Sequence, residues 1–172
     1  MDSAIEAFNV VKQYRGTTTP ALQNFQLSIP TGKLFGLVGP DGAGKTTVLR
    51  ILSTVMDSFS GSATIAGCDV RTDTEGVRKR IGYMPQNFSL YPDLSVWENL
   101  SFFAELNGLP SERRQARMEA MLEFTGLAAF RERRAAELSG GMKKKLALAC
   151  ALVHEPQVLL LDEPSTGVDP VS

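Results

Sequence analysis

Long apolar runs, cysteines and surplus charge are scarce in this sequence, and each scarcity excludes a class of protein. No apolar run approaches the ~20 residues that a membrane-spanning helix requires. The two cysteines, Cys68 and Cys150, form no Cys-x-x-Cys pair, which predicts free thiols rather than a disulfide scaffold or a zinc site. A net charge of −1 gives no global reason to expect nucleic acid as a partner. Because residues 1–6 lack a basic segment and a long apolar core, we expect no signal peptide and a cytoplasmic chain.

What the sequence does contain is a series of short apolar segments whose spacing predicts strands and helices in alternation. Residues 7–11 and 22–29 partly alternate, as half-buried strands do. Residues 34–38 and 158–161 are almost wholly apolar, which predicts strands buried on both faces. Further strands are expected at 62–66 and 81–84.

Helical spacing of apolar residues appears in three places. Val48, Ile51, Leu52 and Val55 predict a helix in the first third of the chain. Two helices are expected within 96–124, divided at Pro110, with Ser111 as a candidate N-cap of the second. A last helix is expected at 141–153, with an inner face made of Met142, Leu146, Cys150 and Val153. A helical insert at about 88–138 therefore interrupts an α/β core.

The segment between the strand at 34–38 and the next helix matches the P-loop pattern G-x-x-x-x-G-K-[ST] in full. It consists of Gly39, Pro40, Asp41, Gly42, Ala43, Gly44, Lys45 and Thr46, with Thr47 next. Such a loop turns backbone N–H groups toward phosphate oxygens. Lys45 is expected to reach the β- and γ-phosphates and Thr46 to ligate Mg²⁺. A glycine-rich turn with an incidental lysine is disfavoured by this placement.

Two carboxylates, Asp162 and Glu163, follow the apolar run at 158–161. This is the Walker B arrangement, in which Asp162 would hold the magnesium shell and Glu163 would polarise the attacking water. Together with the P-loop it predicts a protein that handles a nucleoside triphosphate. A nucleotide switch or a kinase could still be built from these two motifs.

A third motif, Leu138-Ser139-Gly140-Gly141-Met142, opens the last helix without a lysine and forms a second anion-binding helix end. With the P-loop and Walker B it resembles the nucleotide-binding domain of an ABC ATPase over essentially the whole chain. The resemblance implies that Ser139, Gly140 and Gly141 cover the ATP of a second domain. It also implies an α/β fold: a P-loop NTPase (RecA-like) core, antiparallel strands at the N-terminus and a helical subdomain inserted before the signature motif.

The same resemblance assigns further positions and boundaries. Tyr14 matches the residue that stacks on adenine, Gln86 the glutamine that touches magnesium and water, and Asp169 the D-loop aspartate. One domain is expected at 1–172, incomplete at its C-terminus, with a core at 1–87 and 154–172 and a helical subdomain at 88–153. The switch histidine of the family is expected beyond Ser172, so little turnover is expected from these residues alone. His154, the only histidine, is expected at the surface with no catalytic role.

Residues 83–86, 90–100 and 138–146 are similar to exporter ATPases of the ABC-2 type, some with two domains in tandem. This similarity implies ATP and Mg²⁺ as cofactors, transport-coupled hydrolysis, and a place on the cytoplasmic face of the inner membrane. A second nucleotide-binding domain, identical or in tandem, and a membrane permease are the expected partners, with a permease groove near Phe88–Leu90 and Trp97. Trp97 could equally be core packing. A soluble ABC ATPase acting on ribosomes or DNA, and a non-hydrolytic regulatory module, are the alternative functions.

Overall fold

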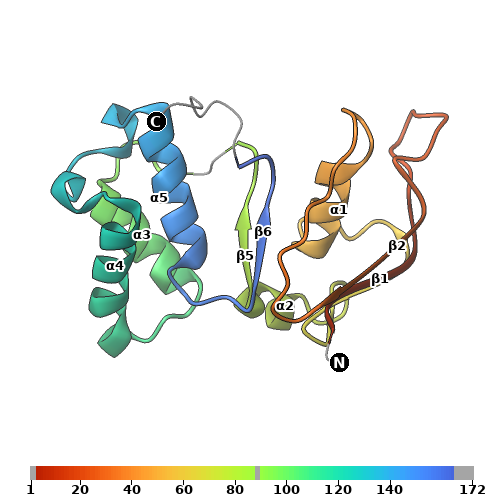
Figure 1. Cartoon of the computed structure of the whole chain (residues 1–172), viewed down its shortest axis with the longest axis horizontal. Coiled ribbons are helices and arrows are strands. Elements are labelled where there is room, and N and C mark those ends of the chain that lie inside the picture. Colours follow the sequence, from red (N-terminus) through yellow and green to blue (C-terminus); the bar gives the residue numbers. More distant parts are fainter. Residues whose placement is uncertain (1–2, 88–89, 165–172) are drawn as a thin grey trace. The chain divides into compact units, whose positions relative to one another are not determined.

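The computed structural model describes residues 3–87 and 90–164, which divide into two compact units, Met1–Ile81 and Gly82–Ser172. The first unit contains a four-stranded sheet in the order β2-β1-β3-β4. Its strands are β1 (Ser3–Lys12), β2 (Leu22–Pro30), β3 (Ser60–Ile65) and β4 (Cys68–Asp69), and each neighbouring pair is antiparallel. The predicted strands near 7–11, 22–29 and 62–66 are thus confirmed, and the antiparallel N-terminal sheet with them (Figure 1).

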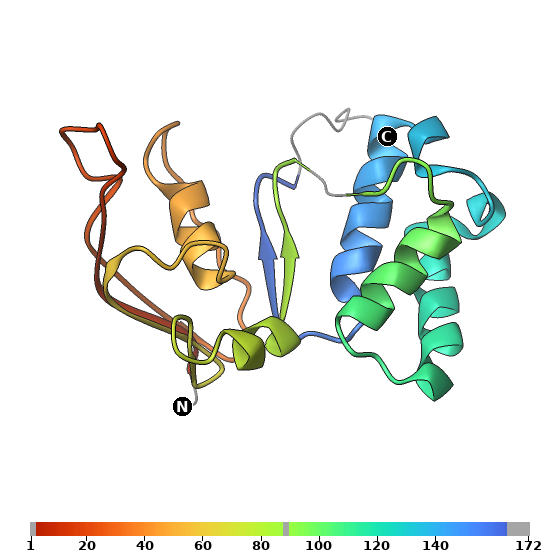
Figure 2. The same ribbon diagram turned by 180° about the vertical axis from the view of Figure 1, so that it is seen from behind.

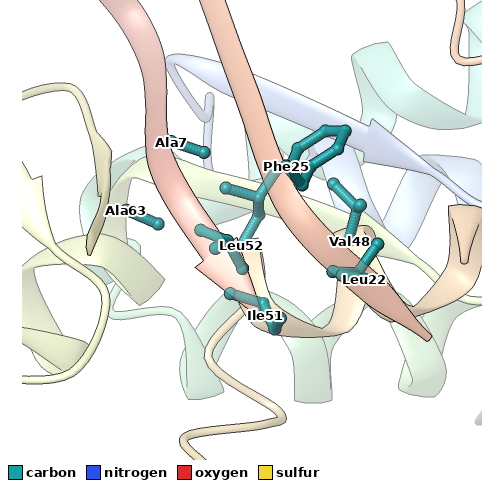
Figure 3. A pocket seen from close by; sticks show the side chains of 8 residues that line it. Ala7, Leu22, Phe25, Val48, Ile51, Leu52 and Ala63 are labelled. Atoms are coloured by element: carbon teal, nitrogen blue, oxygen red, sulfur yellow. The ribbon is translucent and has the colours of Figure 1, made fainter. Parts of the chain in front are cut away.

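One helix of the first unit, α1 (Lys45–Leu52), packs its apolar face against this sheet. Side chains of α1 and of strands β1 to β3 face one another around a small apolar pocket (Figure 3). Val48, Ile51 and Leu52 are buried there as the spacing predicts, whereas Val55 lies beyond the helix end and is exposed. A second helix, α2 (Thr74–Arg80), ends this unit and is capped by Asp73. The sheet thereby fixes the position of α1, and so of the loop that precedes it.

The predicted buried strand at 34–38 is wrong. Residues 33–40 form no strand, and Leu34, Phe35 and Val38 are exposed. An apolar run marks a segment that can be buried, but a strand also needs a hydrogen-bonded neighbour. Within residues 3–87 and 90–164, both sheets are built from other segments.

In its described residues, the second unit has three α-helices around an apolar cluster. They are α3 (Val96–Leu106), α4 (Ser111–Thr125) and α5 (Gly140–Leu152), with short 3-10 turns at Ala128–Phe130 and Ala135–Glu137 (Figure 2). Leu100, Met118 and Leu146 are almost fully buried in the cluster, one from each helix. The division of 96–124 at Pro110 is confirmed, but Ser111 is not the cap. Pro110 occupies the N-cap position, and the Ser111 hydroxyl bonds to Glu112.

The face of α5 that the sequence assigned to the core is confirmed at three positions. Leu146, Cys150 and Val153 are buried, and Met142 is half-buried against the same cluster. Both cysteines are free thiols, as predicted, with Cys68 half-exposed in the first unit and Cys150 buried in the second. His154 is half-buried just after α5. Among the described helices, none has the length and apolar character needed to cross a bilayer.

Two further short strands form as the sequence predicts, β5 (Ile81–Met84), which begins at the last residue of the first unit, and β6 (Val158–Leu161). Val158 and Leu160 are buried, whereas Leu159 is partly exposed. The backbone N–H of Asp162 donates to the carbonyl of Met84 at 2.9 Å. The ends of the two strands therefore lie side by side, and the segments that follow them start from one edge.

Candidate functional site

The P-loop segment leads directly into α1, whose N-cap is Gly44 in a left-handed conformation with φ of 87°. Lys45, the first residue of the helix, turns its side chain back over the loop. Its Nζ donates to the carbonyl oxygens of Gly39 at 2.7 Å and of Pro40 at 2.9 Å. Asp41 Oδ1 lies 4.0 Å from the same nitrogen. The ammonium group is thus held at the mouth of the loop by contacts that phosphate oxygens can replace.

The two threonines that follow Lys45 lie in different surroundings. Thr46 is half-buried, whereas Thr47 is buried, with its Oγ1 3.1 Å from the hydroxyl of Tyr14. Tyr14 also lies 4.0 Å from the sulfur of Met56. The first unit therefore joins Tyr14 to the first turn of α1, although the two are far apart in sequence. Gly39 to Thr47 and Tyr14 form one connected group.

In the second unit, Gln86 and Glu163 meet beyond the ends of β5 and β6. Gln86 Nε2 donates to Glu163 Oε2 at 3.0 Å. Glu163 has a φ of 50°, an uncommon conformation for a residue with a side chain. Asp162, one residue earlier, is buried with 3% of its surface exposed. Gln86, Asp162 and Glu163 therefore lie together at the edge where β5 and β6 end, although Gln86 and Glu163 are 77 positions apart in the sequence.

The signature segment forms the start of α5. The hydroxyl of Ser139 caps this helix by accepting a hydrogen bond from the N–H of Met142 at 3.3 Å. Ser139, Gly140 and Gly141 are all exposed. A β-carbon added at either glycine would meet no atom within 4 Å. The helix end therefore presents an open surface to which a second molecule can come close.

Some predicted residues are not brought into these groups. Asp169 lies outside the described residues, as does Phe88 of the expected groove. Trp97 is half-buried against the helical cluster, and the guanidinium of Arg131 lies 3.4 Å from the centre of its ring. These contacts favour the core-packing interpretation of Trp97. No group of three or more His, Cys, Asp or Glu side chains among the described residues is placed to hold a metal ion.

Comparison with known proteins agrees with the order of these segments. The family described as ABC transporter matches residues 22–166 of the chain. The chain belongs to this family. Among solved structures, it resembles a dimeric post-hydrolysis state of the ATP-binding cassette MJ0796 bound to ADP and Pi. The TM-score is 0.86 at 29% identity, over 97% of this chain and 77% of that one. This likeness confirms the P-loop NTPase fold class.

The curated relatives of this ABC family member include exporters. The chain is 48% identical over 171 residues to a probable multidrug ABC transporter ATP-binding protein, YbhF of Escherichia coli K12. It is 35% identical over 168 residues to the linearmycin resistance ATP-binding protein LnrL of Bacillus subtilis. These matches cover 99% and 98% of the chain but only 30% and 53% of the two relatives. The chain thus corresponds to a part of each of these proteins.

Two features of this ABC family member were missed from the sequence. Ser95 and Glu98 form a capping box at the start of α3, a pattern that the Ser-x-x-Glu spacing could have revealed. The Glu98 carboxylate accepts from the backbone N–H of Ser95 at 2.8 Å, and the Ser95 hydroxyl accepts from the backbone N–H of Glu98 at 3.1 Å. The bond from the Ser95 backbone is the main cause that lowers the pKa of the Glu98 carboxyl. Asn99 is fully buried and bonds to Tyr91, Leu94 and Ser95, fixing the loop before α3. No local pattern marks an asparagine for such a role.

Proposed function

We propose that this chain binds ATP through its P-loop and hydrolyses it with Glu163 as the group that polarises water. The observation that carries the proposal is the contact between Gln86 and Glu163 at the shared edge of β5 and β6. A carboxylate that only held the fold together would have no need of a left-handed backbone and a glutamine partner. The chemistry is consistent with the relative bound to ADP and Pi.

The phosphate-binding role belongs to residues 39–47. Lys45 exchanges the carbonyls of Gly39 and Pro40 for the β- and γ-phosphates, and the backbone of the loop supplies N–H donors. The Tyr14 ring stacks on the adenine base. The helix end at Ser139, Gly140 and Gly141 is proposed to cover the ATP of a second cassette, because its glycines leave room for close approach.

Thr46, Gln86 and Asp162 are proposed to hold Mg²⁺ when ATP binds. The donor chemistry fits, because Mg²⁺ takes oxygen ligands and is usually bound by one or two protein groups together with substrate phosphates. Asp162 supplies a buried carboxylate, and Gln86 keeps its amide oxygen available while its nitrogen bonds to Glu163. The ion would neutralise charge that develops on the phosphates. Asp169 is proposed to lie at the interface of the two cassettes.

Two substitutions test the hydrolytic proposal. Lys45→Ala should abolish ATP binding, whereas Glu163→Gln should retain binding, lose turnover and accumulate a closed dimer. Glu123→Gln, at an exposed position on α4, is the matched control and should hydrolyse ATP at the parental rate. The measurements are nucleotide binding, phosphate release and size-exclusion chromatography on the intact protein. Turnover by Glu163→Gln at the parental rate would show that the assigned base is wrong.

We further propose that hydrolysis drives export through a membrane permease, with the cassette bound to the cytoplasmic face of the inner membrane and paired with a second cassette. Support comes from the relatives, which include a multidrug transporter protein and a resistance protein. We also propose that the cassette divides into two parts, a catalytic core at 1–87 and 154–172 and a helical subdomain at 88–153. A soluble function on ribosomes or DNA is not favoured by these relatives. Recovery of the intact protein with ribosomes instead of membranes would reverse this choice.

The permease contact is proposed on exposed aromatic side chains near α3. Tyr91 and Phe102 are 44% and 37% exposed, and their rings meet edge-on at 4.7 Å between centres. Leu106, one turn beyond Phe102, is 65% exposed. Phe102→Asp should lower the fraction of protein recovered with membranes while leaving ATP binding unchanged. Phe124→Asp, at an exposed position on α4, is the control, and an equal loss in both variants would count against this surface.

A further inference from the structure

Lys12, at the end of β1, is a lysine with only 7% of its surface exposed. Burying a charged group costs free energy unless other groups compensate for the lost water. No carboxylate forms an ion pair with Lys12 in the part of the chain that the structure describes. An apolar residue of similar length would fill the same space at lower cost. Packing alone therefore does not explain why a positively charged residue stands at this position.

The contacts of the Lys12 ammonium group point to an aromatic ring. An ammonium group has three N–H donors. Lys12 Nζ donates to the carbonyl oxygen of Ser58 and, at 3.1 Å, to the hydroxyl of the same residue. It also lies over the face of Tyr14, 5.2 Å from the ring centre, which is within the range of a cation–π interaction. One face of the Tyr14 ring is thereby occupied by a fixed positive charge.

The opposite end of Tyr14 is fixed as well. Its hydroxyl lies 3.1 Å from Thr47 Oγ1, and Thr47 is buried in the first turn of α1, two residues after Lys45. The ring is therefore held at its face by Lys12 and at its edge by the helix that carries the P-loop lysine. These two contacts set both the position and the tilt of the ring relative to the phosphate-binding loop.

We propose that Lys12 is a positioning residue for nucleotide binding, which holds and polarises the Tyr14 ring so that a purine base stacks on its other face. This inference rests on the proposed role of Tyr14 in binding adenine. Because the cation draws electron density from the ring, it strengthens stacking with an electron-rich purine. Lys12 acts on the base through Tyr14, because its ammonium group is bonded to Ser58 and lies over the Tyr14 ring.

The test compares a ligand that has the base with one that lacks it. ADP and pyrophosphate, each with Mg²⁺, are titrated into the intact protein by calorimetry, with competition for the weaker ligand. Lys12→Met should weaken ADP binding by roughly three- to tenfold, as expected for loss of a partly desolvated cation–π contact, and leave pyrophosphate binding nearly unchanged. Lys12→Gln keeps a donor for Ser58 without the charge and should show the same selective loss. Lys33→Met, at an exposed position of the same unit, should change neither ligand.

The outcomes separate this inference from the proposed function. Equal weakening of both ligands by Lys12→Met and Lys12→Gln would mean that Lys12 only supports the fold, and no change in either ligand would mean that it has no part in binding. Either result overturns the inference. If the parent protein binds ADP no more tightly than pyrophosphate, the base contributes nothing to binding. That result would contradict the proposed role of Tyr14 itself, apart from any role of Lys12.

Discussion

Gly44→Ala is predicted to destabilise the first unit for two separable reasons. Gly44 caps α1 with φ of 87°, a conformation that costs an L-residue about 1–2 kcal/mol. A β-carbon at this position would also lie 2.6 Å from the carbonyl oxygen of Ala21 and 2.7 Å from Leu22 Cδ2. Because the first of these atoms belongs to the backbone where β2 begins, it cannot move aside as the end of a side chain could.

Gly42 provides a matched control within the same loop. Its φ is 80°, but a β-carbon there would meet no atom within 4 Å. Gly42→Ala should therefore cost only the backbone term, about 1–2 kcal/mol. Gly44→Ala should cost that amount plus about 1–3 kcal/mol for overpacking against Ala21 and Leu22. The difference between the two variants isolates the steric contribution.

The assay is urea unfolding without nucleotide, combined with amide hydrogen exchange to place the effect in β1, β2 and α1. Leaving out nucleotide ensures that altered phosphate binding does not enter the comparison. The slope of the unfolding curve should be the same in both variants, so that midpoints can be compared directly. Free energies of unfolding that agree within about 0.5 kcal/mol would refute the close contact between Gly44 and the start of β2.

Three further predictions concern the second unit. Asn99→Leu should lower the free energy of unfolding by about 1–3 kcal/mol, because the backbone N–H of Tyr91 loses its acceptor and the carbonyls of Tyr91, Leu94 and Ser95 each lose one of two donors. Hydrogen exchange in the loop from Tyr91 to Ser95 should accelerate. The lowered pKa of Glu98 gives stability that is present above its unfolded pKa of about 4.3 and is lost as pH falls through the folded value. Glu98→Gln should therefore lose less stability than the parent between about pH 5 and pH 3, as measured by urea unfolding at each pH. An equal fall of the free energy of unfolding with pH in both proteins would contradict this. Glu163→Gly should abolish ATP turnover yet be more stable than Glu163→Gln by up to about 1 kcal/mol, because glycine accepts the φ of 50°; a less stable glycine variant in thermal melts would show that this backbone carries no strain.

The parts of the candidate site that could be predicted from sequence are those whose chemistry is local. The P-loop places its glycines, lysine and threonines within nine consecutive positions, so their proximity needs no knowledge of the fold. Gln86 and Glu163 are 77 residues apart, and their hydrogen bond follows only from the side-by-side ends of β5 and β6. The Walker B pattern predicted Glu163 and the family resemblance predicted Gln86, each without the other, and the structure supplied the contact between them.

The errors and omissions have a common physical origin, which is dependence on a partner elsewhere in the chain. The strand predicted at 34–38 needed a neighbouring strand, and apolar composition carries no information about one. The role proposed for Lys12 follows from its contacts with Ser58 and Tyr14. Without these contacts, a lysine at the end of a strand gives no sign of a special role. At Pro110 the pattern correctly divided two helices, but which residue became the cap was settled by backbone conformation.

The different accessibility of the two cysteines allows opening of the second unit to be measured by alkylation. Cys68 is half-exposed in the first unit, and its hydrogen bond to Asp73 raises the pKa of the thiol, so alkylation there is slow and needs mildly alkaline buffer. Cys150 is enclosed by the helical cluster, and burial raises the pKa of its thiol. A reagent added to the folded chain thus marks Cys68 first and reaches Cys150 only when the helices part. The mass of the product, followed over time, records how often the second unit opens without any introduced label.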